Sequence, residues 1–154
     1  MLNARIAAGA PFVASGALAI LAGGATAAAI AYHPTQHLVW MVAYLVLVVG
    51  VMQAVFGAGQ AWLAGHPPAG RTIWGQWLLF NLGNTGVIGG TLGNRTDMVA
   101  IGTLLYVAAI AWFFVGIRHA RVRGWGVAYR VLLGLVFLSA CTGVVISAVS
   151  RGGA

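Results

Sequence analysis

Apolar residues fill five long stretches of the chain, separated by short polar or glycine- and proline-containing segments. A helix rises about 1.5 Å per residue, so about 20 residues cross the roughly 30 Å hydrocarbon core of a bilayer. No stretch shows the alternation over about ten residues that is typical of a membrane β-barrel strand. The pattern predicts an all-α, polytopic membrane bundle forming one domain over residues 1–154. Its transmembrane helices are predicted at about 12–31, 34–64, 73–93, 97–117 and 127–149.

The composition agrees with a membrane location. Hydrophobic residues make up 61% of the chain and charged residues 6%, against about 25% charged residues in soluble domains. Eight arginines and one acidic residue, Asp97, give a net charge of +7. The arginines are spread over short segments rather than one basic patch, so we expect no nucleic-acid partner. No nucleophile elbow, phosphate-binding loop or zinc signature is present, and the sequence predicts no catalytic activity.

The distribution of arginines predicts the orientation. With five crossings, two arginines fall on one side, Arg95 and Arg151, and six on the other: Arg5, Arg71, Arg118, Arg121, Arg123 and Arg130. The positive-inside rule then places the N-terminus in the cytoplasm and the C-terminus outside. The first stretch also has the three zones of a signal peptide, but its length favours a retained helix. We expect an integral protein of a bacterial or archaeal cytoplasmic membrane.

Small and amide residues indicate where helices pack. Helices in lipid associate through close backbone approach and interhelical hydrogen bonds, because lipid tails are as apolar as leucine. The predicted seams are Gly50, Gln53, Gly57 and Gln60 on the second helix, Gly83, Gly86, Gly90 and Gly93 on the third, and Ser139, Gly143 and Ser147 on the fifth. The amides Gln76, Asn81 and Asn84 need partners in hydrocarbon. They either join helices or, with Gln53, edge a ligand pocket.

Four histidines are the candidate ligands. His66 and His119 lie in predicted cytoplasmic turns, and we assign them no function. His33 and His37 are four residues apart at the outer end of the second helix, a spacing that suits a transition metal if one helix covers both. Pro34 opposes a shared site, because a residue before proline is driven out of helical geometry. The sequence therefore favours His37 alone.

His37 begins a distinct face of the second helix. Trp40, Met41 and Tyr44 follow it at i+3, i+4 and i+7, opposite the glycine and glutamine seam. An aromatic belt at the membrane interface would account for the tryptophan and the tyrosine. A wall of a haem site would account for all four residues, since an ionisable side chain near a membrane span is a functional candidate. Both interpretations remain open at this point.

Residues 37–60 and 74–90 together resemble helices II and III of haem-copper oxidase subunit I and its small haem-bearing membrane relatives. The resemblance covers about a third of the chain. It implies a b-type haem with His37 as an axial ligand. Histidines equivalent to the family's second haem ligand and copper ligands are absent, so oxygen reduction is not expected. Without an intramembrane carboxylate, proton pumping is not expected either. The iron would be five-coordinate, or would bind Met98 or a partner subunit. The expected cofactor-binding residues are His37, Trp40, Met41, Tyr44, Asn81 and Met98.

A second resemblance concerns size and one motif. The translocator, or tryptophan-rich sensory, proteins also have five helices, and residues 76–81 resemble one of their glutamine-to-asparagine stretches. Their proline-rich first loop is missing here. Three functions follow from the sequence as expectations. The first is a small haem protein for electron transfer or gas sensing. The second is a non-catalytic accessory subunit of a larger respiratory complex, or a homo-oligomer. The third is a protein that binds an apolar ligand such as a porphyrin, sterol or quinone.

Overall fold

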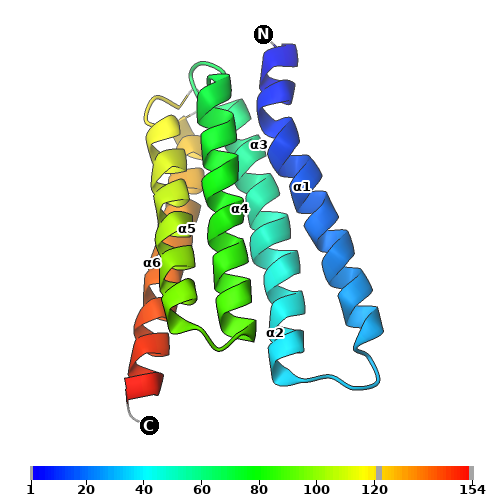
Figure 1. The fold of residues 1–154 in the computed structure, drawn as a ribbon. Helices are drawn as coiled ribbons and strands as arrows, with labels where there is room; N and C mark the ends of the chain where they lie inside the picture. Colours follow the sequence, from blue (N-terminus) through cyan, green and yellow to red (C-terminus); the bar gives the residue numbers. More distant parts are fainter. Residues whose placement is uncertain (1, 121–122, 153–154) are drawn as a thin grey trace. The chain divides into compact units, whose positions relative to one another are not determined.

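The computed structural model describes residues 2–120 and 123–152, with side chains at 2–120 and 124–143. Helix α1 is Leu2–Ala29. Helices α2 (Gln36–Tyr44), η1 (Leu45–Met52) and α3 (Gln53–Leu63) follow one another without a break. Helices α4 (Gly70–Leu92), α5 (Thr96–Gly116) and α6 (Arg123–Gly152) complete the chain (Figure 1). No strand forms in these described ranges, so the predicted all-α class is confirmed, with five continuous helices.

Four of these helices are long and apolar enough to cross a membrane. The spans are Leu2–Ala29, Gln36–Leu63, Thr96–Gly116 and Gly124–Gly143. Helix α4 has 23 residues, which is sufficient length, but Arg71 and the amides Gln76, Asn81 and Asn84 lower its hydropathy. The coarse prediction of a helical membrane protein is therefore supported, while a crossing by α4 remains a prediction.

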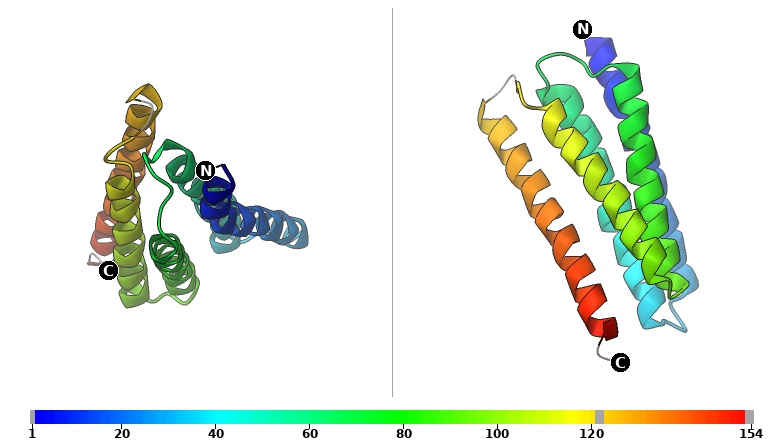
Figure 2. Two further views of the ribbon diagram at one scale, coloured as in Figure 1. Left: turned by 90° about the horizontal axis from the view of Figure 1, so that it is seen from above. Right: turned by 60° about the vertical axis from the view of Figure 1, so that its left-hand side comes forward.

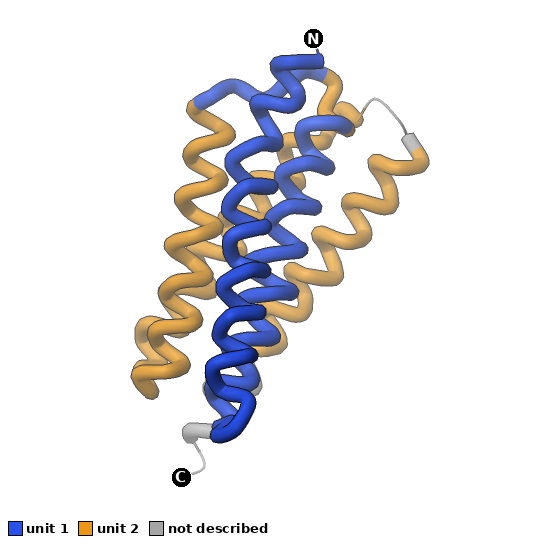
Figure 3. The backbone as a smooth tube through the Cα atoms, turned by 90° about the vertical axis from the view of Figure 1, so that its right-hand side faces the viewer, with its two compact units in different colours: residues 1–62, 66–70 blue, residues 63–65, 71–154 orange. Residues whose placement is uncertain are grey.

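The helices group into two compact units (Figure 3). Unit 1 contains residues 1–62 and 66–70, and unit 2 contains residues 63–65 and 71–154. In unit 1, α1 packs against the continuous helix 36–63. In unit 2, α5 lies between α4 and α6 (Figure 2). The expectation of a single membrane domain stays a prediction.

The first helix begins ten residues earlier than predicted. Pro11, one residue before the predicted start, lies inside α1. Proline removes one helical hydrogen bond, the one that its N–H would donate to the Ala7 carbonyl oxygen, and proline is more frequent in membrane helices than in soluble ones. The Ser15 hydroxyl donates to the carbonyl oxygen of Pro11 itself at 2.6 Å. The sequence suggested that Arg5 lies in a loop, but Arg5 lies within α1.

The second long helix begins at Gln36 with Thr35 as its N-cap. The Thr35 hydroxyl accepts a hydrogen bond from the Leu38 backbone N–H at 3.4 Å. Pro34 thus precedes the helix instead of opening it, and His33 lies in the preceding turn. Mid-way along, η1 is a π-helix, a wider turn that is often found at functional sites. The sequence pattern gave no sign of it.

Unit 1 is held by close contact of glycines. A methyl group on Gly16 would lie 2.6 Å from the Gly50 carbonyl oxygen, and one on Gly50 would lie 3.2 Å from the Gly16 oxygen. A methyl group on Gly57 would overlap Phe12. All four residues of the predicted seam are buried: Gly50, Gln53, Gly57 and Gln60. The seam predicted for the second helix is confirmed.

Unit 2 repeats this arrangement between α4 and α5. A methyl group on Gly83 would lie 2.8 Å from the Gly102 oxygen, and one on Gly102 would lie 2.7 Å from the Gly83 oxygen. Small residues allow helix backbones in membrane proteins to approach this closely. Gly90 packs on Val99 in the same way. These seam positions are confirmed, as is Gly86, which packs on Gly102.

Two further seam predictions fail. Gly93 lies beyond the end of α4 and is exposed. On α6, Ser139 and Gly143 are exposed, and a methyl group on Gly143 would meet nothing within 4 Å. Ser147 lies outside the described side chains. Spacing of small residues permits close approach but does not say which face meets a neighbour.

The turn between α4 and α5 is a Schellman motif. Asn94 has a φ of 53°, a left-handed conformation that asparagine tolerates better than most residues. The Arg95 N–H donates to the Gly90 oxygen at 2.7 Å, and the Asn94 N–H donates to the Thr91 oxygen at 3.4 Å. These two bonds satisfy carbonyls at the end of α4 and turn the chain directly into α5.

Candidate functional site

His37 lies in the first turn of α2 and is exposed. Within the part of the chain that the structure describes, its imidazole has no hydrogen-bonding partner. One ring nitrogen is therefore available to a metal or to a haem iron, and this is the property that an axial ligand needs. His33 is also exposed but lies outside the helix, so the two imidazoles do not share a helical face as the four-residue spacing allowed.

Trp40, Met41 and Tyr44 continue from His37 along α2, and all three are half-buried. The Trp40 and Tyr44 ring centroids lie 5.0 Å apart with an interplanar angle of 31°. On the other side of the helix, Val42 and Val46 pack on Gly23 of α1. Because α2 is regular up to Tyr44, the histidine and the two aromatic rings face away from α1.

A helical wheel drawn at 3.6 residues per turn places the Gly50 seam opposite His37. The side that packs on α1 is formed by Val42 and Val46 in the N-terminal half of the long helix and by Gly50 and Gly57 in the C-terminal half. These positions recur every four or seven residues, so one side faces α1 through the π-helix η1.

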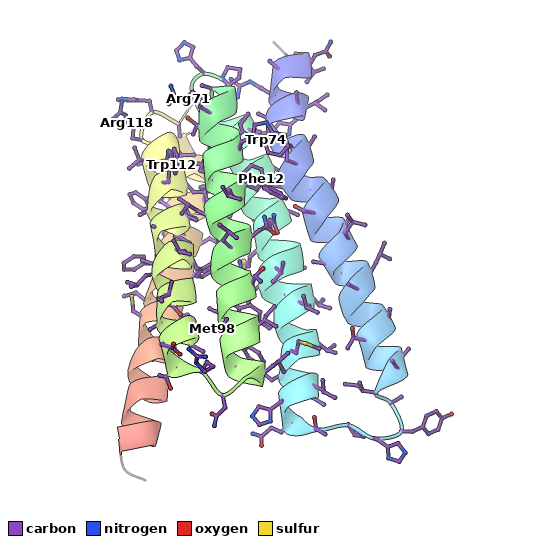
Figure 4. All side chains as sticks on the ribbon, in the orientation of Figure 1. Phe12, Arg71, Trp74, Met98, Trp112 and Arg118 are labelled. Carbon is purple, nitrogen blue, oxygen red and sulfur yellow. The ribbon has the colours of Figure 1, made fainter. Side chains whose placement is uncertain are left out.

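Asn81 and Met98 belong to unit 2, whereas the four residues of α2 belong to unit 1. The Asn81 amide donates to the Trp77 carbonyl oxygen of its own helix at 2.8 Å. Met98 is 40% exposed in the first turn of α5 (Figure 4), and its terminal methyl group lies over Gly89. A site that joins these two residues to His37 stays a prediction.

The described residues contain no group of three or more His, Cys, Asp or Glu that could hold a metal ion. This argues against a metal centre built from such side chains alone in that part of the chain. A haem iron needs fewer protein ligands than such a metal ion, because the porphyrin supplies four nitrogen ligands and the protein adds one or two. The free imidazole of His37 is compatible with that requirement.

A polar site inside unit 1 was only partly anticipated. Gln53, the first residue after η1, is fully buried, and its side-chain nitrogen donates to the Ser15 hydroxyl at 2.7 Å. The hydroxyl donates in turn to Pro11, so the amide orientation is determined. The side-chain oxygen of Gln53 has no hydrogen-bonding partner. The spacing of Pro11 and Ser15, four residues apart, was the available signal for this site.

Two arginines have roles that the charge count missed. Arg5 is 4% exposed and donates to the Ala61 oxygen at 2.8 Å and the Trp62 oxygen at 3.1 Å, near the end of α3. Arg130 of α6 donates to the Ile117 and Arg118 oxygens at 2.9 and 2.8 Å, just beyond the end of α5. Cations at helix C-termini satisfy unpaired carbonyls and oppose the helix dipole. Both arginines therefore link helices within their own unit.

The one acidic side chain of the sequence, Asp97, pairs with Arg95 at 2.6 Å. This hydrogen-bonded pair raises the pKa of the Arg95 guanidinium above its ordinary value. The pair is exposed, and exposed ion pairs add little stability. Because Asp97 is used in this pair, no acidic side chain remains to form an ion pair with the other arginines.

Comparison of the chain with protein-family models, with curated proteins and with solved structures gave no match. The resemblances to haem-copper oxidase subunit I and to the translocator proteins therefore remain hypotheses based on the residues themselves.

Proposed function

We propose that this chain is a small integral membrane protein that binds a b-type haem through His37 and serves electron transfer or gas sensing. The observation that carries the proposal is the free imidazole of His37, at the start of a helical face on which Trp40 and Tyr44 pack together. A haem bound there would supply one-electron chemistry at its iron, or an open position for a gas molecule.

The residues of this face have separate tasks in the proposal. His37 provides the axial nitrogen, and its helix positions the ring at the membrane interface. Trp40 and Tyr44 offer apolar ring faces that shield a porphyrin from water, and Met41 lies beside them. If Met98 provides the second axial ligand, thioether binding raises the reduction potential relative to a second histidine.

The membrane arrangement is part of the same proposal. Five helices cross the bilayer, α4 among them, with the N-terminus in the cytoplasm and the C-terminus outside. The arginines support this orientation even though two of them also cap helices, because Arg5 and Arg130 keep their charge at the arginine-rich end. His37 then lies toward the outer face of a bacterial or archaeal cytoplasmic membrane.

Absorption spectroscopy tests the haem proposal. The protein purified in detergent, after expression with a haem precursor, should show a Soret band that shifts on reduction with dithionite. His37→Ala should remove most of the band, since the axial nitrogen is lost. His33→Ala is the matched control, because His33 is exposed outside the helix, and it should keep the wild-type spectrum. A wild-type protein without a Soret band, or an unchanged band in His37→Ala, refutes the proposal.

A second function is favoured by the unpartnered oxygen of Gln53. A buried acceptor without a donor costs about 1–3 kcal/mol, and an unsatisfied group in a native fold calls for an explanation. We propose as the alternative that the chain binds an apolar ligand carrying a hydroxyl group, such as a sterol or a quinol, which donates to this oxygen. The π-helix η1 ends at the residue before Gln53.

Lipid extraction followed by mass spectrometry distinguishes this alternative. Wild-type protein should retain one hydroxyl-bearing apolar compound, and Gln53→Met should retain at least about fivefold less, because a hydrogen bond worth about 1 kcal/mol is lost. Thr142→Val is the control, since the Thr142 hydroxyl is exposed and donates to its own helix at 2.9 Å. Equal retention by wild type and Gln53→Met contradicts the alternative.

A role as an accessory subunit or a homo-oligomer also remains a proposal. Blue-native electrophoresis of membranes solubilised in mild detergent should then show the chain in a larger species, and migration as a lone protomer would contradict it.

A further inference from the structure

Three arginines at one end of unit 2 lack a counter-charge within the chain. Arg71 lies in the first turn of α4, Arg118 follows α5, and the Arg130 side chain binds the carbonyls just after α5. The sequence has one acidic residue, Asp97, and Asp97 pairs with Arg95 at the α4–α5 turn, the opposite end of this unit. Anions that neutralise the three arginines must therefore come from outside the side chains of this protein.

The backbone beside Arg118 is held in place. Its N–H donates to the Val115 oxygen at 3.2 Å, and its carbonyl accepts from Arg130 at 2.8 Å. Two residues on, Ala120 pairs with Ala64 in an isolated antiparallel bridge. The contact fixes the Arg130 guanidinium at the backbone of Arg118, and a second positive charge on the same short segment favours an anionic ligand over a neutral one.

Aromatic side chains lie at the same end of unit 2 as these cations (Figure 4). Trp112 packs its ring on Gly75, one helical turn beyond Arg71 on the same face of α4. Trp74 is 59% exposed and contacts Trp77 edge-to-face, with ring centroids 5.7 Å apart. Figure 4 shows Arg71, Trp74, Trp112 and Arg118 at the same end of unit 2. Tryptophan is enriched at the level of lipid headgroups, where its ring is apolar and its N–H meets water.

We propose that this end of unit 2 binds the phosphate headgroup of an anionic phospholipid. Arg71 and Arg118 bind the phosphate, Arg130 adds charge while holding Arg118, and the Trp74 and Trp112 rings contact the glycerol and the upper acyl chains. In the orientation proposed above this end faces the cytoplasmic leaflet, whose surface is negative. The site is separate from His37 and does not depend on a haem.

Native mass spectrometry of the full chain in detergent tests this site. With equal amounts of phosphatidylglycerol and phosphatidylcholine added, the wild-type protein should retain the anionic lipid in preference. An arginine near the membrane surface contributes roughly fivefold to such binding, so Arg71→Gln/Arg118→Gln should weaken phosphatidylglycerol binding by about 25-fold. Both side chains are exposed, and an unchanged unfolding midpoint should show that the double variant keeps its fold.

Arg95→Gln is the matched control, because Arg95 is also exposed but already pairs with Asp97. It should retain phosphatidylglycerol as the wild type does. Equal binding of the two lipids, full binding by the double variant, or an equal loss in Arg95→Gln overturns the proposal. Displacement of the lipid by millimolar inorganic phosphate also overturns it, since the site would then recognise a free anion instead of a lipid headgroup.

Discussion

Gly83→Ala should separate α4 from α5 and lower the free energy of unfolding by about 1–3 kcal/mol, the cost typical of overpacking. The added methyl group would lie 2.6 Å from the Tyr106 backbone nitrogen and 2.8 Å from the Gly102 oxygen. Both are backbone atoms, which cannot move aside as a flexible side chain does. Denaturant titration of the detergent-solubilised protein, followed by circular dichroism, measures the change.

Gly134→Ala is the control for Gly83→Ala, because a methyl group at Gly134 of α6 would meet nothing within 4 Å. Alanine favours helix over glycine by up to about 1 kcal/mol, so this variant should be neutral or more stable. If the two variants unfold at the same denaturant concentration, the close contact of Gly83 with α5 is not what stabilises unit 2.

Arg5→Met should weaken the contact of α1 with the end of α3 by about 3 kcal/mol. The guanidinium donates to two carbonyl oxygens, of Ala61 and Trp62, and hydrogen bonds from charged donors are each worth about 1.5–3 kcal/mol. Methionine fills most of the space but cannot donate. The loss should appear as a lower thermal unfolding temperature and as faster hydrogen exchange at the end of α3.

Arg5→Lys separates the effect of charge from that of geometry. Lysine keeps the positive charge near the helix terminus but lacks the planar fork that reaches two acceptors, so the loss should be intermediate. Arg71→Met is the exposed control and should change stability little. Equal stability of Arg5→Met and the wild type would show that burial of this arginine does not hold the two helices together.

The candidate site and the helix seams were predicted from different kinds of sequence information. His37 was selected because it is an ionisable group at the edge of an apolar span, and that reasoning needs only position along the chain. The Gly50 and Gly83 seams followed from spacing, since close helix contact in lipid requires small residues. Asn81 and Met98 were grouped with His37 in connection with the resemblance to the oxidase helices, and such a resemblance does not determine which helices are neighbours.

Other features depended on long-range contacts and escaped prediction. Arg5 was counted as a loop charge, because nothing in the sequence near Arg5 indicates that its guanidinium contacts the end of α3. Proline is favoured at the first position of a helix, where its missing N–H costs nothing, but Pro11 lies inside α1. The π-helix at 45–52 similarly has no counterpart in the hydrophobic pattern.

By itself, the sequence determined the all-α class, the number of continuous helices and the membrane character, because these depend on the length and hydropathy of each stretch. Only the tertiary structure decided which glycines meet a neighbour, that Arg5 and Arg130 bind helix ends, and that one oxygen of Gln53 is buried without a donor. The physical reason is that hydrophobic burial in a bilayer is a local property of each segment. Hydrogen bonds and close contacts between helices depend instead on which residues, distant in the chain, lie side by side.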